Sequence, residues 1–162
     1  MDGERSPGGV KDEVDRLARA LADLPPRDAR LASLVLLDGL PRLRCAAHYG
    51  IPLEAADVWL LRAVRGWSQR LGEAQPPPAP DALERRQARA LGAALEGTLP
   101  PGDPDVPRPA LSFSLRVRSR APGLRALLAE QERAAPPPSR WERWIRLAVA
   151  LALVALALLL SR

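Results

Sequence analysis

Three residue types that carry much of protein chemistry are nearly missing from this 162-residue chain. It has one cysteine, Cys45, one histidine, His48, and one lysine, Lys11. A single cysteine excludes an intramolecular disulfide, which is typical of a reducing compartment such as the cytosol. One cysteine and one histidine also fall short of the four ligands of a structural zinc site. We therefore expect neither a metal nor any other cofactor.

Sequence patterns typical of enzymes are lacking as well. The chain contains no GxxxxGK[ST], GxGxxG, GxSxG or HExxH pattern, and these are the usual signatures of phosphate, dinucleotide, hydrolase and zinc chemistry. Cys45 and His48 are three residues apart and would share a helical face, but a Cys–His nucleophile also needs an orienting group and a pocket. We predict that the protein is not an enzyme and has no small-molecule substrate. A membrane-tethered enzyme built around Cys45 or His48 is the alternative in another class.

Residues that favour β-strands are scarce, since aromatics make up 4% of the chain and Leu and Ala supply most of its apolar content. Leu and Ala favour helices, so the composition predicts a mostly α protein. Gly72 and Gly97 occupy C-cap positions, and Asp81 with Glu84 indicates a capping box. Hydrophobic periodicity predicts helices over residues 12–24, 28–38 with a short continuation over 41–50, 53–71, 81–96 and 122–134.

Proline-rich stretches divide these helices. QPPPAP (75–80) separates the third and fourth helices, and LPPGDPDVPRP (99–109) is predicted to be extended, with polyproline character. We accordingly expect residues 1–98 to form a helical domain and residues 99–138 to form a Pro-rich, basic linker.

One stretch of that linker, LSFSLRVR (111–118), breaks the helical pattern. Its strict alternation of apolar and polar residues is typical of a half-buried strand, and the chain has no second run like it. Two arrangements are open: strand addition to another chain, or an extended segment lying on the helices, which we favour. The apolar residues of this face are Leu111, Phe113, Leu115 and Val117.

The basic charge is unevenly distributed. The net charge is +5, and residues 140–162 hold +3 of it, with four arginines against one glutamate. A nucleic-acid-binding protein normally displays its basic charge on the folded domain. We therefore do not expect nucleic acid as a partner.

The longest apolar run is Leu147 to Leu160, 14 residues of Leu, Ala or Val. At about 21 Å it is shorter than the roughly 30 Å hydrocarbon core of a bilayer. However, Ser139 and Glu142 indicate a capping box. With this cap the predicted helix covers residues 140–162 and is about 34 Å long. Trp and Arg residues precede the run, as at membrane interfaces. We predict a transmembrane helix rather than a buried helix or a removed C-terminal signal. The predicted interfacial residues are Trp141, Arg143, Trp144 and Arg146.

The position of this helix predicts a topology. Only Ser161 and Arg162 follow the apolar run that ends at Leu160, so we expect post-translational insertion as a tail anchor. The arginines on the domain side predict a cytosol-facing domain. A short span suits a thin membrane, which favours the mitochondrial outer membrane or the endoplasmic reticulum.

Two short stretches resemble the Bcl family of apoptosis regulators. Val14, Ala18, Leu21, Ala22 and Asp23 follow the spacing of the family's death-motif helix, with Ala18 at the position of its leucine and Pro25 within the helix that should continue. The Asn-Trp-Gly-Arg signature of the multi-helix members is absent, and VRGWSQ (64–69) resembles it only weakly. The resemblance implies a helical bundle that regulates apoptosis at the mitochondrial or endoplasmic reticulum membrane.

These observations favour a non-enzymatic, single-pass, tail-anchored protein whose cytosolic helical domain binds a protein partner at an organelle membrane. Trp59 and Trp67 are eight residues apart and share one side of a helix, where they either belong to the core or contribute to a partner-binding groove. The apolar face of 111–118 is a separate possible partner-binding surface. A Bcl-like regulator and a viral membrane-associated protein are the alternatives, the latter because the bias to 23 arginines against one lysine suits some GC-rich viral genomes.

Overall fold

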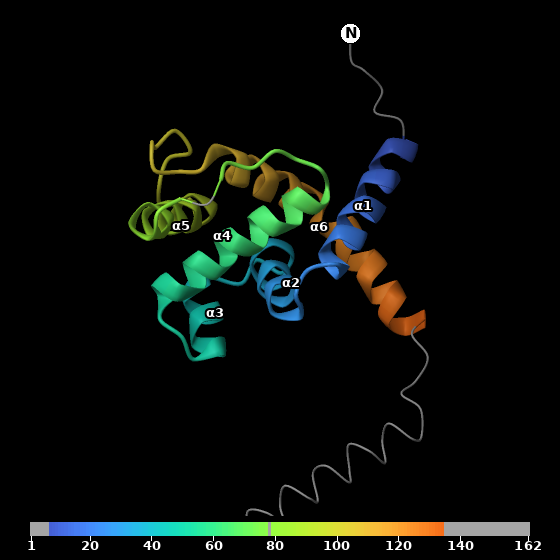
Figure 1. Cartoon of the computed structure of the whole chain (residues 1–162). Coiled ribbons are helices and arrows are strands. Elements are labelled where there is room, and N and C mark those ends of the chain that lie inside the picture. The colour runs from blue at the N-terminus through green and yellow to red at the C-terminus, as the bar shows by residue number, and fades with distance from the viewer. Residues whose placement is uncertain (1–6, 78, 135–162) are drawn as a thin grey trace, which may run out of the picture. The chain divides into compact units, whose positions relative to one another are not determined.

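The computed structural model describes residues 7–77 and 79–134, and every regular element within them is helical. This confirms the prediction of a mostly α protein. Figure 1 shows the arrangement of the elements. In chain order they are α1 (Pro7–Ala22), α2 (Pro26–Ala32), the π-helix η1 (Ser33–Leu37), α3 (Arg42–Tyr49), α4 (Leu53–Arg70), α5 (Asp81–Leu95) and α6 (Arg108–Ala134).

Helix α4 is the centre of the compact unit. It packs against α1, α2, α3 and α5 (Figure 1). Its amphipathic pattern predicts a buried stripe, and Leu61, Val64 and Trp67 are fully buried. Three residues of the predicted core face are therefore confirmed as buried, and its other two, Val58 and Leu71, are partly buried.

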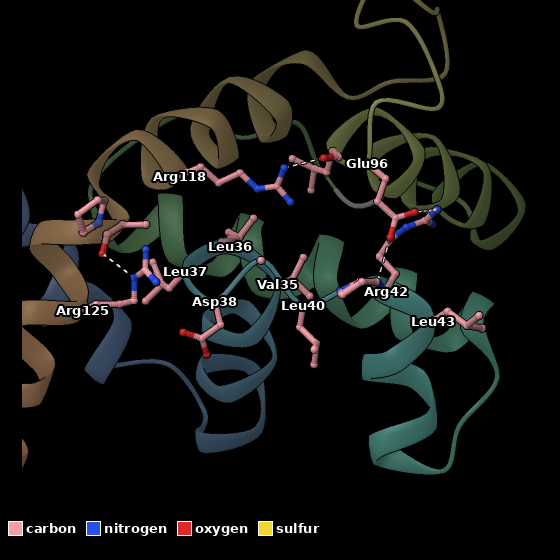
Figure 2. Close-up of a pocket in the computed structure, with 15 residues that line it drawn as sticks. Val35, Leu36, Leu37, Asp38, Leu40, Arg42, Leu43, Glu96, Arg118 and Arg125 are labelled. Atoms are coloured by element: carbon pink, nitrogen blue, oxygen red, sulfur yellow. Dashed lines mark hydrogen bonds and ion pairs between the residues drawn. The ribbon is translucent and has the colours of Figure 1, made fainter.

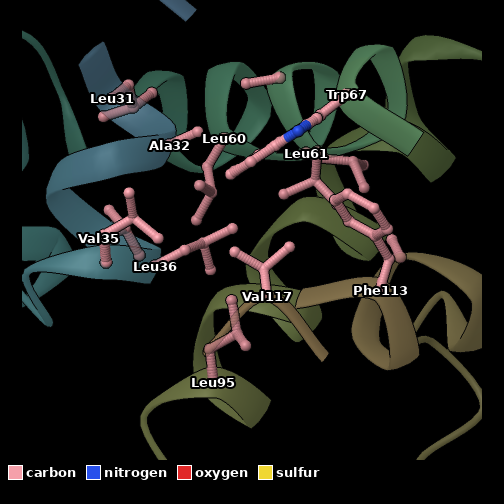
Figure 3. Close-up of a cluster of buried hydrophobic side chains, with 14 of the residues drawn as sticks. Leu31, Ala32, Val35, Leu36, Leu60, Leu61, Trp67, Leu95, Phe113 and Val117 are labelled. Atoms are coloured by element: carbon pink, nitrogen blue, oxygen red, sulfur yellow. The ribbon is translucent and has the colours of Figure 1, made fainter. Parts of the chain in front are cut away.

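Trp67 links three helices in the core. Its indole Nε1 donates a hydrogen bond to the carbonyl of Leu17 in α1, at 3.0 Å, which satisfies the polar end of a buried ring. The ring meets Phe113 of α6 edge-on, with centroids 5.7 Å apart. Val117 of α6 lies in the same cluster (Figure 3). The N-terminal part of α6 is thus an integral part of the core.

The prediction of extended structure over residues 111–118 is wrong, because this stretch lies inside α6. Its alternation covers only eight residues, whereas over a longer window the apolar residues recur every three or four positions, as in a helix. Leu115 is 49% exposed, while Ser114 is buried and its hydroxyl donates to the Ala110 carbonyl at 2.8 Å. The buried face consists of Ala110, Leu111, Phe113, Ser114, Val117, Ala121 and Leu124.

Two further features of residues 99–138 differ from the predicted linker. Residues 99–107 form turns, with backbone bonds from Asp103 to Pro100 and from Val106 to Asp103, so this part is not extended. The helix predicted from residue 122 already begins at Arg108, and Pro122 lies within it. The compact unit that contains the other helices extends to Leu128.

Helix ends follow the predicted signals at two places and depart from them at a third. Gly72 and Gly97 have φ angles of 77° and 74°, which a glycine adopts without strain, so both C-cap predictions are confirmed. The predicted capping box at Asp81 is wrong: α5 has Pro80 at its N-cap and no side-chain cap bond. Glu84 instead accepts hydrogen bonds from Arg62 of α4, because that pairing joins two helices.

The predicted membrane helix, residues 140–162, lies outside the described residues, and so do its interfacial residues Trp141, Arg143, Trp144 and Arg146. Within residues 7–77 and 79–134, no helix combines the length and apolar character needed to cross a bilayer.

Candidate functional site

An open groove with a volume of about 770 Å³ lies where η1, the start of α3, the end of α5 and the middle of α6 meet (Figure 2). This volume is in the range of ligand-binding sites in proteins. Its lining residues are Val35, Leu36, Leu37, Asp38, Gly39, Leu40, Pro41, Arg42, Leu43, Leu95, Glu96, Arg118, Ala121, Pro122 and Arg125.

The groove has an apolar floor and an exposed apolar rim. Leu36 and Leu37 lie in the π-helical turn and are buried, and Leu40 packs partly against the core. At the rim, Leu43 is 67% exposed. Of the large apolar side chains in the described part of the chain, Leu43 and Leu115 are exposed, and Leu43 alone of these two lines the groove. Covering such a leucine stabilises a complex by about 1.5–3 kcal/mol.

A network centred on Arg42 forms one wall of the groove. The Arg42 Nη1 donates to both carboxylate oxygens of Asp57 in α4, each at 2.9 Å. Its Nη2 donates to Glu96 at 2.9 Å, and its backbone N–H donates to the same carboxylate at 3.0 Å. Glu96 therefore caps the start of α3 and also joins it to the end of α5. The network fixes the position of the wall that carries Leu43.

Burial and pairing act in opposite directions on this network. Burial raises the pKa of Asp57, and the Arg42 guanidinium acts to lower it. The Asp57 carboxylate is 3% exposed, so its charge depends on Arg42. Gly92 of α5 makes room for that arginine, since a Cβ at this position would lie 2.4 Å from the Arg42 Nη1.

The opposite wall, formed by α6, carries two arginines without an acidic partner. Arg118 donates to the backbone carbonyl of Leu95 at 2.6 Å, and burial lowers the pKa of its guanidinium, opposed by the charge of Glu96. Arg125 donates to the carbonyl of Ala121 in its own helix at 3.5 Å. Within the described residues, no carboxylate lies within 4.0 Å of either guanidinium.

A second polar cluster joins α4 to α5 outside the groove. Arg62 donates to both oxygens of Glu84, at 3.0 and 2.6 Å, and its hydrogen bond lowers the pKa of this carboxyl, against the effect of burial. Arg65 is buried near the same carboxylate at 3.9 Å and donates to Gln87 at 2.9 Å. This cluster holds two helices together, and the buried Nε of Arg65 has no hydrogen-bond partner within the described residues.

The six residues predicted to form a partner-binding surface do not line the groove. Trp67, Leu111, Phe113 and Val117 are buried in the core, and Leu115 is exposed elsewhere on α6. Trp59 is partly buried under the guanidinium of Arg27 and meets the ring of Tyr49 edge-on at 6.4 Å.

The sequence alone does not predict the groove, because its lining comes from three stretches that are far apart in the chain, residues 35–43, 95–96 and 118–125. The one local sequence feature that points to the groove is Leu43. It is an apolar residue that does not lie on the buried face of α3 formed by Cys45 and Ala46.

Cys45 and His48 take up ordinary packing positions. Cys45 is buried, its thiol lies 3.9 Å from the Leu40 carbonyl, and burial raises its pKa, which keeps it protonated. His48 is exposed and meets the ring of Tyr49 edge-on at 5.0 Å. Across residues 7–77 and 79–134, no three His, Cys, Asp or Glu side chains are grouped to hold a metal ion.

Three of the five residues that resemble the Bcl death motif face this chain's own core, whereas Ala22 and Asp23 are exposed. Val14, Ala18 and Leu21 are at most 8% exposed, so this side of α1 is occupied by intramolecular contacts. Trp67, in the second resembling stretch, is the core residue described above. No family model, curated protein or solved structure matches this chain.

Proposed function

We propose that this chain is a non-enzymatic, single-pass membrane protein whose helical unit binds a protein partner at the membrane surface. The single observation that carries the partner-binding part is the open apolar groove with Leu43 exposed at its rim. The 14-residue apolar run and its tryptophan and arginine flanks support the membrane part. In this proposal residues 140–162 are the anchor, and the helical unit faces the cytosol on the mitochondrial outer membrane or the endoplasmic reticulum.

The partner that suits the groove best is an amphipathic helix. Such a helix presents apolar residues at positions i, i+3 or i+4, and i+7 to an apolar groove. Leu43 gives it exposed apolar surface to cover, Leu36 and Leu37 form the buried floor beneath, and the Arg42 network keeps one wall in place. A membrane anchor also raises the effective concentration of any partner on the same membrane.

The experiment is a selection of helical peptides from a displayed library of amphipathic sequences against the full chain in phosphatidylcholine nanodiscs. We expect the selected peptides to bind Leu43→Glu at least about tenfold more weakly than the unmodified chain, because the variant loses apolar contact and places a charge at the rim. Leu115→Glu is the matched control, since Leu115 is also exposed but lies outside the groove. Peptides that bind Leu43→Glu and the unmodified chain equally well would contradict the proposal.

A Bcl-like apoptosis regulator is a second candidate, favoured by the presence of an apolar groove in an all-helical unit. In this version the groove does the binding, because the motif-like face of α1 is buried. A synthetic death-motif helix should then compete with the selected peptides for the groove. If it does not compete at any soluble concentration, this candidate is removed and the general proposal stands.

A further inference from the structure

We propose that the helix bound in this groove carries a carboxylate that pairs with Arg118, and that Arg125 strengthens the preference for acidic partners. The inference rests on the proposed function, since it specifies the partner of the same groove. It comes from the charges on the α6 wall and not from its apolar surface.

Arg118 is unlike the other partly buried arginines of the unit. Arg42 pairs with two carboxylates and Arg120 with one, whereas Arg118 has only the backbone carbonyl of Leu95 at 2.6 Å. Glu96 acts on it from more than 4.0 Å, and that carboxylate already accepts two hydrogen bonds from Arg42. Arg118 therefore keeps donors open to an incoming anion.

Arg125 extends the same wall. It lies seven residues after Arg118, which is about two helical turns, and both side chains line the groove (Figure 2). Its one hydrogen bond is to a carbonyl of its own helix. The other free charge in the lining is Asp38, an exposed carboxylate in the segment after η1. A partner helix is therefore complementary when its acidic side faces α6.

Closing the groove makes this charge pattern selective. A bound helix removes water from Arg118, and a buried guanidinium that loses water without gaining an anion is destabilised. A carboxylate gives Arg118 a bidentate, charge-assisted partner. In the same apolar helix, an amide at this position would leave the Arg118 charge unpaired, and a lysine would repel it. We therefore expect both helices to bind more weakly than the acidic one.

The test uses the peptides selected above, labelled with a fluorophore, and measures their affinity for the full chain in phosphatidylcholine nanodiscs by anisotropy. We expect Asp or Glu to be enriched at one position of the selected peptides. Changing that residue to its amide should weaken binding at least about tenfold. With Arg118→Gln the same peptide change should alter the dissociation constant by less than about twofold, because the pairing group is gone. Arg85→Gln, an exposed arginine outside the groove lining, is the control.

Two results separate this inference from the proposed function. Peptides that need Leu43 but bind equally well with acid or amide would overturn the acidic preference and leave the groove function in place. A failure to select any Leu43-dependent peptide would overturn both. Should circular dichroism show that Arg118→Gln is unfolded, Arg125→Gln provides the readout, since Arg125 is exposed. A partial loss of acid discrimination in that variant supports the inference, and full retention contradicts it.

Discussion

At the residue scale, Arg42 determines how three helices meet. It contacts Asp57, 15 residues away, and Glu96, 54 residues away, so one side chain joins α3, α4 and the end of α5. A buried carboxylate that loses its partner is strongly destabilising. The Arg42 side chain keeps this position because Gly92 has no Cβ to occupy the same space.

We predict that Gly92→Ala lowers the free energy of unfolding by about 2–4 kcal/mol, because the new Cβ would displace Arg42 from Asp57 and the gain in helix propensity is smaller. Urea unfolding of the full chain in mild detergent, followed by circular dichroism, measures this. Gly66→Ala is the matched control in α4, where the nearest atoms to a Cβ are 3.4 Å away. It should leave stability unchanged or raise it by up to about 1 kcal/mol. Equal effects of the two substitutions would contradict the assigned role of Gly92.

We predict that the ion pair between Arg62 and Glu84 makes the free energy of unfolding depend on pH. The hydrogen bond that Glu84 accepts from Arg62 places its folded-state pKa below the ordinary value of 4.5. A depressed pKa contributes stability above the unfolded-state value, and this contribution is lost as the pH falls through the folded-state pKa. The unfolding free energy should therefore fall more between about pH 6 and about pH 3 for the unmodified chain than for Glu84→Gln. An identical fall in both proteins would show that the pair does not shift this pKa.

At the scale of secondary-structure elements, the sequence predicts some helices correctly, but it does not predict the first part of α6. The helices over 53–71 and 81–96 were predictable because long amphipathic patterns and C-cap glycines mark them. The helical state of residues 111–118 was not predictable. Over only eight residues, Leu111, Phe113 and Val117 fit both the alternation of a strand and the repeat of a helix. The Arg42 network and the groove could not be predicted for another reason, because they join residues that are far apart in the sequence and that no local pattern relates.

The helix and the strand predict different effects of substitutions at Phe113 and Leu115. In a strand Phe113 and Leu115 would share one face, whereas in α6 Phe113 is buried and Leu115 is exposed. We expect Phe113→Ala to lower the unfolding free energy by about 3–5 kcal/mol and Leu115→Ala to change it by less than about 0.5 kcal/mol. Thermal and urea unfolding of both variants check this. Similar losses for the two residues would argue for a strand-like face.

At the scale of the whole molecule, the proposal joins a helical unit with a binding groove to a membrane anchor. In this proposal the unit supplies apolar contact and a basic wall for a partner helix. Residues 140–162 are proposed to supply the location as the anchor. We predict that the tagged chain colocalises with markers of the mitochondrial outer membrane or the endoplasmic reticulum, and that removal of these residues disperses it through the cytosol, as fluorescence imaging would show.

The central claim, that residues 140–162 anchor the chain in a membrane, is tested most directly by alkaline carbonate extraction of membranes from cells that express the tagged chain. The comparison includes a chain lacking residues 140–162 and the matched variant Leu153→Arg/Leu156→Arg, which keeps the length but places two charges in the span, at about 2.5–3.5 kcal/mol each for insertion. The account predicts that the intact chain stays in the membrane pellet while both altered chains are released. An intact chain that is extracted as freely as the truncated one would contradict it.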